Sequence, residues 1–275
     1  MMDINKHSME LNKIYNEDNI SLIRRMPDDF IDLTVTSPPY DNLRDYKGYT
    51  FDFETLAKEL YRVTKPGGVV VWVVGDAVVD GSKTLTSYRQ AIKAKEIGFN
   101  IYDVIIYEKS GSAPPHSGRY FNSFEYMFIF TKGRPKTVNI LEDKPNIWAG
   151  ANTGNITRRE KDGGLTSKGN KKIKELGVRT NVWRYFNGRG QAAKDLTAHK
   201  HPAIFPEALA KDHIISWSNK GDVVFDPFMG SGTTAVAALD VSRNYIGAEI
   251  AKEYVEIANE RIKNHVTQTE LFDYI

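Results

Sequence analysis

Residues 223–235 of the 275-residue chain read VVFDPFMGSGTTA. The apolar start predicts a buried strand, the proline and the two glycines predict a turn, and the residues that follow predict the first turn of a helix. Gly230 and Gly232 have no Cβ, so the backbone there can turn sharply and approach a ligand closely. Because ligands of parallel α/β sheets bind at the carboxyl ends of strands, the segment predicts a ligand site at a sheet edge.

An acid follows this glycine loop at a distance suited to ribose. The next predicted strand ends in Glu249, 17 residues after Gly232, and a carboxylate about 20 residues along binds the ribose hydroxyls in dinucleotide folds. The loop also fits the dinucleotide pattern G-x-G-x-x-A, so a nicotinamide cofactor is one alternative, whereas the lysine of a phosphate-binding P-loop is missing. A glycine turn that only packs a helix against a strand is the plainer alternative.

Short apolar runs and amphipathic stretches alternate on both sides of the loop. The predicted strands are 32–36, 69–74, 102–107, 125–131, 222–225 and 245–249, and the predicted helices are 53–64, 84–97, 206–217, 233–240 and 252–264. Apolar strands that alternate with helices are typical of a mostly parallel sheet covered on both faces. We therefore predict a doubly wound α/β fold, and the 41% hydrophobic content is enough to bury its core.

Charge is distributed unevenly along the chain. The whole chain has a formal net charge of +2, but residues 131–200 hold 16 Lys or Arg against 6 Asp or Glu. The same stretch holds 9 of the 21 glycines and has no long apolar periodicity. It predicts an inserted, basic, loop-rich lobe that separates residues 1–130 from residues 201–275.

Missing features exclude several classes of function. The chain has no Cys, which excludes disulfides, thiolate zinc sites and cysteine nucleophiles. The first 17 residues have no apolar core, and the longest apolar run, Val69–Val74, has six residues, so we expect a cytoplasmic protein without a membrane span. His199 and His201 lack a clustered acid, and we predict no metal site.

A second segment, Thr36-Ser37-Pro38-Pro39-Tyr40, follows a predicted strand. Consecutive prolines restrict the backbone and remove two N–H donors, which leaves acceptors. The Ser37 hydroxyl and the Pro38 carbonyl can accept both N–H bonds of one exocyclic amine, while Tyr40 offers a flat face to a base. Such acceptors favour the pyramidal nitrogen whose lone pair attacks a sulfonium methyl group. An ordinary proline turn at a strand end is the alternative.

Together the two segments resemble the β class of S-adenosylmethionine-dependent DNA amino-methyltransferases, in which the catalytic motif precedes the cofactor motif. Thr36–Tyr40 resembles the catalytic motif and Phe225–Thr234 the cofactor motif. His201–Leu209 resembles the segment that precedes the cofactor motif, and Tyr245–Glu249 the strand that carries the ribose-binding acid. The resemblance covers most of residues 15–264.

The resemblance implies a seven-stranded methyltransferase sheet, S-adenosylmethionine as cofactor and double-stranded DNA as partner, with residues 131–200 as the target-recognition region. The residues implied in catalysis are Ser37, Pro38, Pro39 and Tyr40. Those implied in cofactor binding are His201, Phe205, Asp226, Pro227, Phe228, Gly230, Ser231, Gly232, Thr233, Thr234 and Glu249. A homodimer and a cognate restriction endonuclease are both compatible with the resemblance.

The composition of the chain limits which atoms of DNA can accept the methyl group. Methylation of cytosine C5 needs a thiolate, which this chain lacks, so cytosine N4 and adenine N6 remain. In the family that the chain resembles, Ser at the position of Ser37 is commoner in cytosine-N4 enzymes, and we favour that base over adenine. A protein-glutamine methyltransferase, which usually has Asn there, and a non-catalytic DNA-binding module are further alternatives.

The basic lobe predicts contacts with DNA phosphates and base edges. The candidates are Arg158, Arg159, Lys171, Lys172, Lys174, Arg179, Arg184 and Arg189, with Trp183, Tyr185 and Phe186 as aromatic neighbours that can wedge between bases. Asp76 follows the strand 69–75 and is expected either to support the site or to cap a helix or turn. Residues 41–52 are expected to form a loop that closes over the base, and residues 109–122 are expected to form a second flexible loop.

Overall fold

The computed structural model describes residues 9–39, 52–111, 118–154, 156–167, 169–186 and 205–272, without the side chains of 268–272. The chain divides into two compact units. Unit 1 comprises Met1–Asn139 and Val182–Ile275, and unit 2 comprises Ile140–Asn181.

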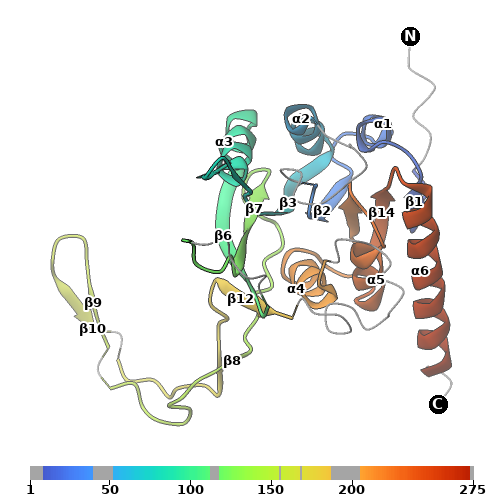
Figure 1. Ribbon diagram of the computed structural model, residues 1–275. Coiled ribbons are helices and arrows are strands. Elements are labelled where there is room, and N and C mark those ends of the chain that lie inside the picture. The colour runs from blue at the N-terminus through green and yellow to red at the C-terminus, as the bar shows by residue number, and fades with distance from the viewer. Residues whose placement is uncertain are drawn as a thin grey trace. The chain divides into compact units, whose positions relative to one another are not determined.

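Unit 1 is built on an eight-stranded sheet with the order β1-β14-β13-β2-β3-β7-β6-β12 (Figure 1). Its strands are β1 (Lys13–Tyr15), β2 (Ile31–Thr36), β3 (Thr64–Val74), β6 (Asn100–Lys109), β7 (Phe124–Thr131), β12 (Val182–Tyr185), β13 (Val223–Asp226) and β14 (Asn244–Ala248). Every neighbouring pair is parallel except the two that β7 forms with β3 and β6. The predicted mostly parallel sheet is therefore confirmed, and β12 adds an eighth strand at its edge.

Helices cover both faces of the sheet, as the doubly wound fold predicts. They are α1 (Asn19–Arg25), α2 (Phe53–Val63), α3 (Thr86–Ile97), α4 (Glu207–Trp217), α5 (Thr233–Asp240) and α6 (Lys252–Phe272). Helices α1, α2 and α3 pack side by side on one face, and α4, α5 and α6 lie on the other (Figure 1). Among the described residues, no helix is both long enough and apolar enough to cross a bilayer.

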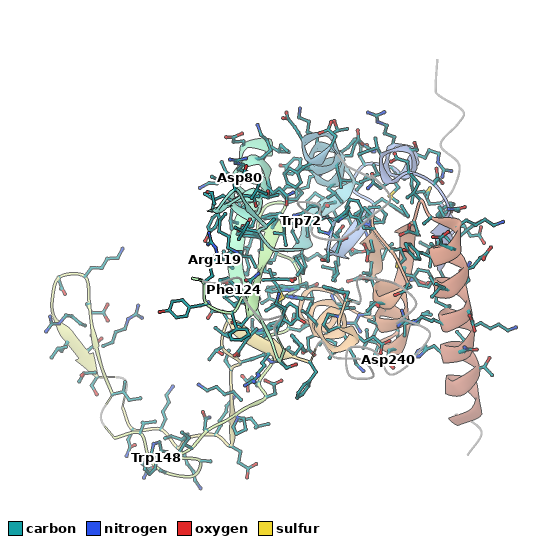
Figure 2. The ribbon with its side chains drawn as sticks, viewed as in Figure 1. Trp72, Asp80, Arg119, Phe124, Trp148 and Asp240 are labelled. Carbon is teal, nitrogen blue, oxygen red and sulfur yellow. The ribbon has the colours of Figure 1, made fainter. Side chains whose placement is uncertain are left out.

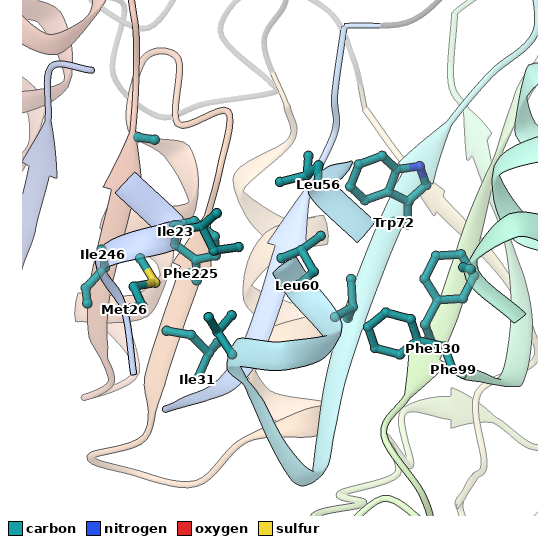
Figure 3. Close-up of a cluster of buried hydrophobic side chains, with 14 of the residues drawn as sticks. Ile23, Met26, Ile31, Leu56, Leu60, Trp72, Phe99, Phe130, Phe225 and Ile246 are labelled. Atoms are coloured by element: carbon teal, nitrogen blue, oxygen red, sulfur yellow. The ribbon is translucent and has the colours of Figure 1, made fainter. Parts of the chain in front are cut away.

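The core on the α1–α3 face is a continuous apolar cluster (Figure 3). Trp72 of β3 lies beside Leu56 and Leu60 of α2 (Figure 3). Phe225 of β13 and Ile246 of β14 lie beside Ile23 and Met26, at the end of α1, and each of these side chains is at most 2% exposed. Burying a large apolar side chain contributes about 1.5–3 kcal/mol relative to exposure. The same packing holds β13 against β2, the two strands that carry the motifs.

Two elements, β3 and α6, are longer than predicted by five residues or more. Strand β3 begins at Thr64, five residues before the expected start, because Thr64 pairs with Ile31 before the Pro-Gly-Gly irregularity. Helix α6 extends to Phe272, because residues 265–272 contain neither Gly nor Pro to end it. Helix α5 has the predicted bounds.

Unit 2 is a set of short antiparallel pairs. Strands β9 (Thr157–Arg159) and β10 (Leu165–Ser167) form one pair, and β8 (Lys144–Pro145) and β11 (Leu176–Gly177) form another. A further pair, β4 (Val78–Val79) with β5 (Ser82–Lys83), belongs to unit 1. The predicted lobe, residues 131–200, differs from unit 2 at both ends, since residues 131–139 and β12 belong to unit 1.

Candidate active site

Strands β2 and β13 bring the two sequence motifs to one edge of the sheet. The strands are parallel neighbours, and Thr34 pairs with Phe225. Ser37 directly follows β2, and Asp226 is the last residue of β13. The proline turn and the glycine loop therefore leave the sheet in the same direction from adjacent strands, as a shared pocket requires.

A buried carboxylate joins the two motifs. Asp226 Oδ1 accepts a 2.7 Å hydrogen bond from the Thr36 hydroxyl and a 2.9 Å bond from the Phe228 N–H. Asp226 Oδ2 accepts a 2.6 Å bond from the Thr234 hydroxyl. One side chain thus connects the end of β2, the glycine loop and the first turn of α5.

The pKa of Asp226 reflects its burial. Desolvation raises the pKa of this carboxyl, and the Thr234 and Thr36 hydroxyls and the Phe228 N–H oppose that rise by donating to the charged form. Hydrogen bonds to the charged form stabilise it. Asp226 therefore acts as an acceptor shared by the end of β2, the glycine loop and the first turn of α5.

The glycine loop depends on backbone conformations that favour glycine. Gly230 has a φ of 51° and Gly232 a φ of 84°, both in the left-handed region. Gly232 is the N-cap of α5, and a Cβ there would lie 2.8 Å from the Cβ of Ala258 on α6. Ser231, Thr233 and the two glycines are buried, so any larger residue at 232 would displace the loop.

Glu249 lies against this loop at the end of β14. Its Oε2 accepts a 2.9 Å hydrogen bond from the Gly230 N–H, and its Oε1 accepts a 2.8 Å bond from the Ala251 N–H. Burial raises the pKa of this half-buried carboxyl, while the two N–H donors oppose the rise. Each carboxylate oxygen has a further lone pair, so a ribose diol can bind without displacing either N–H.

The remaining predicted pocket residues differ in how far the structure describes them. Pro38 is buried, and Ser37 and Pro39 are half-buried. Phe205 is half-buried just before α4, and the ring of Phe228 contacts that of Trp72 edge-on at 6.5 Å. Tyr40, Arg189, His199 and His201 lie outside the described residues, as do 41–51 and 112–117 of the two predicted loops.

Asp76 has a structural partner. Its carboxylate accepts a 2.9 Å bond from the Ser87 N–H and a 2.8 Å bond from the Ser87 hydroxyl. Ser87 lies in the first turn of α3. Of the two roles expected for Asp76, the contacts match helix capping.

The predicted DNA contacts occupy two environments. Arg158 and Arg159 of β9 and Lys171, Lys172 and Lys174 are exposed in unit 2. Arg179 pairs with Asp143, and Arg184 is exposed on β12 in unit 1.

Trp183 and Tyr185 were expected to wedge between bases, and this is wrong. Both rings are buried, and Trp183 stacks on His213 at 4.6 Å, because β12 alternates these rings into the core.

Sequence reasoning missed a buried arginine behind the glycine loop. Arg261 of α6 is 2% exposed and bonds to Ser231, Thr233 and Glu207. A signal for it exists in the sequence. Val255 and Ala258 form a stripe at spacing three, and Arg261 continues this stripe where an apolar residue is expected.

A family model described as DNA methylase matches residues 31–260, which include both motifs. The chain belongs to the DNA methylase family. This DNA methylase is 57% identical to the orphan methyltransferase M.BamHII of Bacillus amyloliquefaciens over 238 residues, 86% of this chain and 90% of the relative. It is 32% identical to the type II methyltransferase M.BglII of Bacillus subtilis, over 90% of this chain and 68% of the relative.

Solved structures share the fold of this methylase. The PvuII DNA methyltransferase, described as cytosine-N4-specific, matches with a TM-score of 0.68 at 19% identity, over 96% of this chain and 94% of that chain. The complex of M1.HpyAVI with SAM matches with a TM-score of 0.57 at 24% identity, over 91% and 98%. The expected family is confirmed, and the protein is a DNA amino-methyltransferase. Oxidoreductase, protein-methylating and non-catalytic roles are thereby set aside.

Proposed function

We propose that this methylase transfers a methyl group from S-adenosylmethionine to the exocyclic N4 amine of cytosine in a specific sequence of double-stranded DNA. The proposal of cytosine over adenine rests on Ser37, at the first position of the Ser-Pro-Pro-Tyr motif. The absence of Cys excludes the covalent route to cytosine C5. Direct transfer to an amine requires no enzyme nucleophile.

The residues around the glycine loop suit S-adenosylmethionine, which supplies a methyl group on a sulfonium sulfur. Gly230 and Gly232 let the backbone approach the methionine part without a Cβ in the way. Glu249 has free lone pairs for the ribose hydroxyls, and the half-buried Phe205 and Phe228 offer apolar contact to the adenosyl group. Asp226 keeps this loop attached to the catalytic turn through Thr36 and Thr234.

The catalytic turn binds and orients the amine. Transfer would form an N–C bond and break the C–S bond of the sulfonium, which leaves S-adenosylhomocysteine, and the proton that the amine loses would pass to solvent. The Ser37 hydroxyl and the Pro38 carbonyl accept the two N–H bonds, which favours the pyramidal nitrogen that attacks the methyl carbon. Because a stacked base cannot present its amine here, the target nucleotide must leave the duplex, and Tyr40 offers a face for it.

Unit 2 supports the DNA partner through its exposed cations. Arg158, Arg159, Lys171, Lys172 and Lys174 are positioned on a scaffold of short strand pairs rather than in a core. Phosphate contacts of this kind contribute sequence-independent affinity that weakens with salt. The target-recognition role of residues 131–200, the cytoplasmic location, a homodimer and a cognate endonuclease stay predictions.

Adenine N6 is the second candidate, because the same two acceptors can bind either amine. The experiment that separates them incubates unmodified DNA with the protein and S-adenosylmethionine, then digests the DNA to nucleosides. We expect N4-methylcytosine. If N6-methyladenine is the only product, the choice of base is overturned. If neither methylated nucleoside forms, the proposed activity is overturned. The S37A variant is the matched control, and we expect it to give the same nucleoside at a lower kcat.

A further inference from the structure

Helix α6 presents one buried cation to the glycine loop. The Nη1 of Arg261 donates a 2.5 Å hydrogen bond to the Ser231 carbonyl. It also lies 3.2 Å from the Ser231 hydroxyl and 3.3 Å from the Thr233 hydroxyl. These acceptors span the point at which the glycine loop becomes α5, so one nitrogen constrains both the loop and the start of the helix.

The other side of the guanidinium reaches α4. Arg261 Nη2 donates a 2.6 Å bond to Oε1 of Glu207, whose side chain is 20% exposed against 1% for that of Arg261. Glu207 is the first residue of α4, two residues after Phe205. The rigid fork of Arg holds donors in a fixed plane. A single side chain therefore links two segments that we assign to the cofactor site.

Ala258 sets the distance between α6 and the loop. Ala258 and Arg261 are three residues apart and lie on the same face of the helix. The Cα of Ala258 would lie 3.2 Å from a Cβ added at Gly232, so the helix backbone itself contacts this glycine closely. The small residue allows the approach, and the arginine then satisfies the acceptors of the loop.

We propose that Arg261, with Glu207 as its counter-ion, is a positioning residue for S-adenosylmethionine binding. It acts by holding the glycine loop and the start of α4 in their binding geometry before the cofactor arrives. A preorganised loop loses less conformational entropy on binding, which raises affinity. This inference rests on the assignment of the glycine loop to the cofactor under the proposed function.

A second buried arginine provides the matched control. Arg243 is 9% exposed, and it donates to the Ser218 hydroxyl at 3.1 Å and the Ser218 carbonyl at 2.7 Å. Ser218 is the C-cap of α4, and Arg243 directly precedes β14, so these bonds lie at the opposite edge of the sheet. Replacing Arg243 removes a comparable set of bonds without touching the loop.

The test compares R261M, R261K, R261M/E207M and R243M with the wild-type protein. Calorimetry gives the Kd for S-adenosylmethionine, steady-state kinetics give KM for cofactor and for DNA, and thermal unfolding gives Tm. We expect R261M and R261M/E207M to weaken cofactor binding about tenfold to a hundredfold, the loss expected for bonds to a charged donor. KM for DNA should change little. R243M should lower Tm and leave cofactor affinity unchanged.

The double variant protects the test against misfolding, because it leaves no unpaired carboxylate in the partly buried position of Glu207. R261K should recover part of the affinity, since an ammonium can pair with Glu207 but cannot bond to Glu207 and Ser231 at once through two nitrogens held in one plane. A folded double variant that binds S-adenosylmethionine like wild type would overturn the proposal. The proposal would also be overturned if R243M weakened cofactor binding as much as R261M does. If neither Met variant folds, wild-type affinity in R261K overturns it. A wild-type protein that binds no S-adenosylmethionine overturns the proposed function itself.

Discussion

The hydroxyl of Thr36 donates a 2.7 Å hydrogen bond to Oδ1 of Asp226, a residue 190 positions further along the chain. Both side chains are at most 5% exposed. The bond connects the last residue of β2 to the last residue of β13. The geometry of the catalytic turn and that of the glycine loop are therefore coupled through one buried carboxylate.

Removing this bond should affect both stability and turnover. We expect T36V, which keeps the side-chain shape, to lower the free energy of unfolding by about 1–3 kcal/mol, because Asp226 loses one of its donors. kcat should fall, since Ser37 is the adjacent residue. Urea unfolding and methyl-transfer assays measure the two effects. T36S keeps the hydroxyl and should remain close to wild type. If T36V had the same unfolding free energy and kcat as wild type, the coupling would be contradicted.

Two glycines with the same φ separate backbone strain from close packing. Gly221 and Gly232 both have a φ of 84°, but a Cβ at Gly221 meets nothing within 4 Å, whereas one at Gly232 meets Ala258 at 2.8 Å. G221A should cost about 1–2 kcal/mol of unfolding free energy through its backbone alone. G232A should cost more and should also weaken cofactor binding. Denaturant unfolding and calorimetry test this, and equal costs would contradict it.

Cofactor binding should depend on pH through Glu249. Burial raises the pKa of this carboxyl, and the nearby Asp226 charge adds to the rise. Protonation therefore favours the folded state, and this contribution to stability is present at acidic pH and lost as pH rises through the raised pKa. Ribose hydroxyls bind the charged form, so affinity should fall as pH decreases through the same range.

Calorimetry in buffers with different ionisation enthalpies should then detect proton release on binding. E249Q cannot titrate, so we expect it to bind S-adenosylmethionine weakly and with a smaller pH dependence. Binding without proton release in the range where Glu249 titrates would contradict the assignment of this residue to the ribose.

The cations of unit 2 should control DNA affinity and its salt dependence. We expect R158E/R159E/K171E/K172E to weaken DNA binding strongly and to reduce the slope of log K against log salt. The slope falls because fewer phosphate contacts form and fewer counterions are released on binding. Cofactor affinity should stay at the wild-type level. Fluorescence anisotropy at several salt concentrations measures the DNA affinity and its dependence on salt. Unchanged DNA affinity would refute this assignment.

Local residues alone predicted much of the cofactor half. Helix α5 begins and ends where predicted, because Gly232 is an N-cap that favours positive φ and apolar residues follow it without a break. The Ser-Pro-Pro turn is equally local, since each proline restricts its own φ and the residue before it. Such features depend on neighbours a few positions away, and the chain carries them in any context.

Burial and pairing across long separations could not be read from the chain alone. Trp183 and Tyr185 stand in a basic, glycine-rich stretch, and only the pairing of β12 with β6 turns them into core residues. The stripe on α6 indicates that Arg261 faces inward, but only the packing of α6 against the glycine loop and α4 shows which acceptors it meets. Local propensity acts within a turn or a strand, whereas burial is a property of partners that folding brings from distant positions.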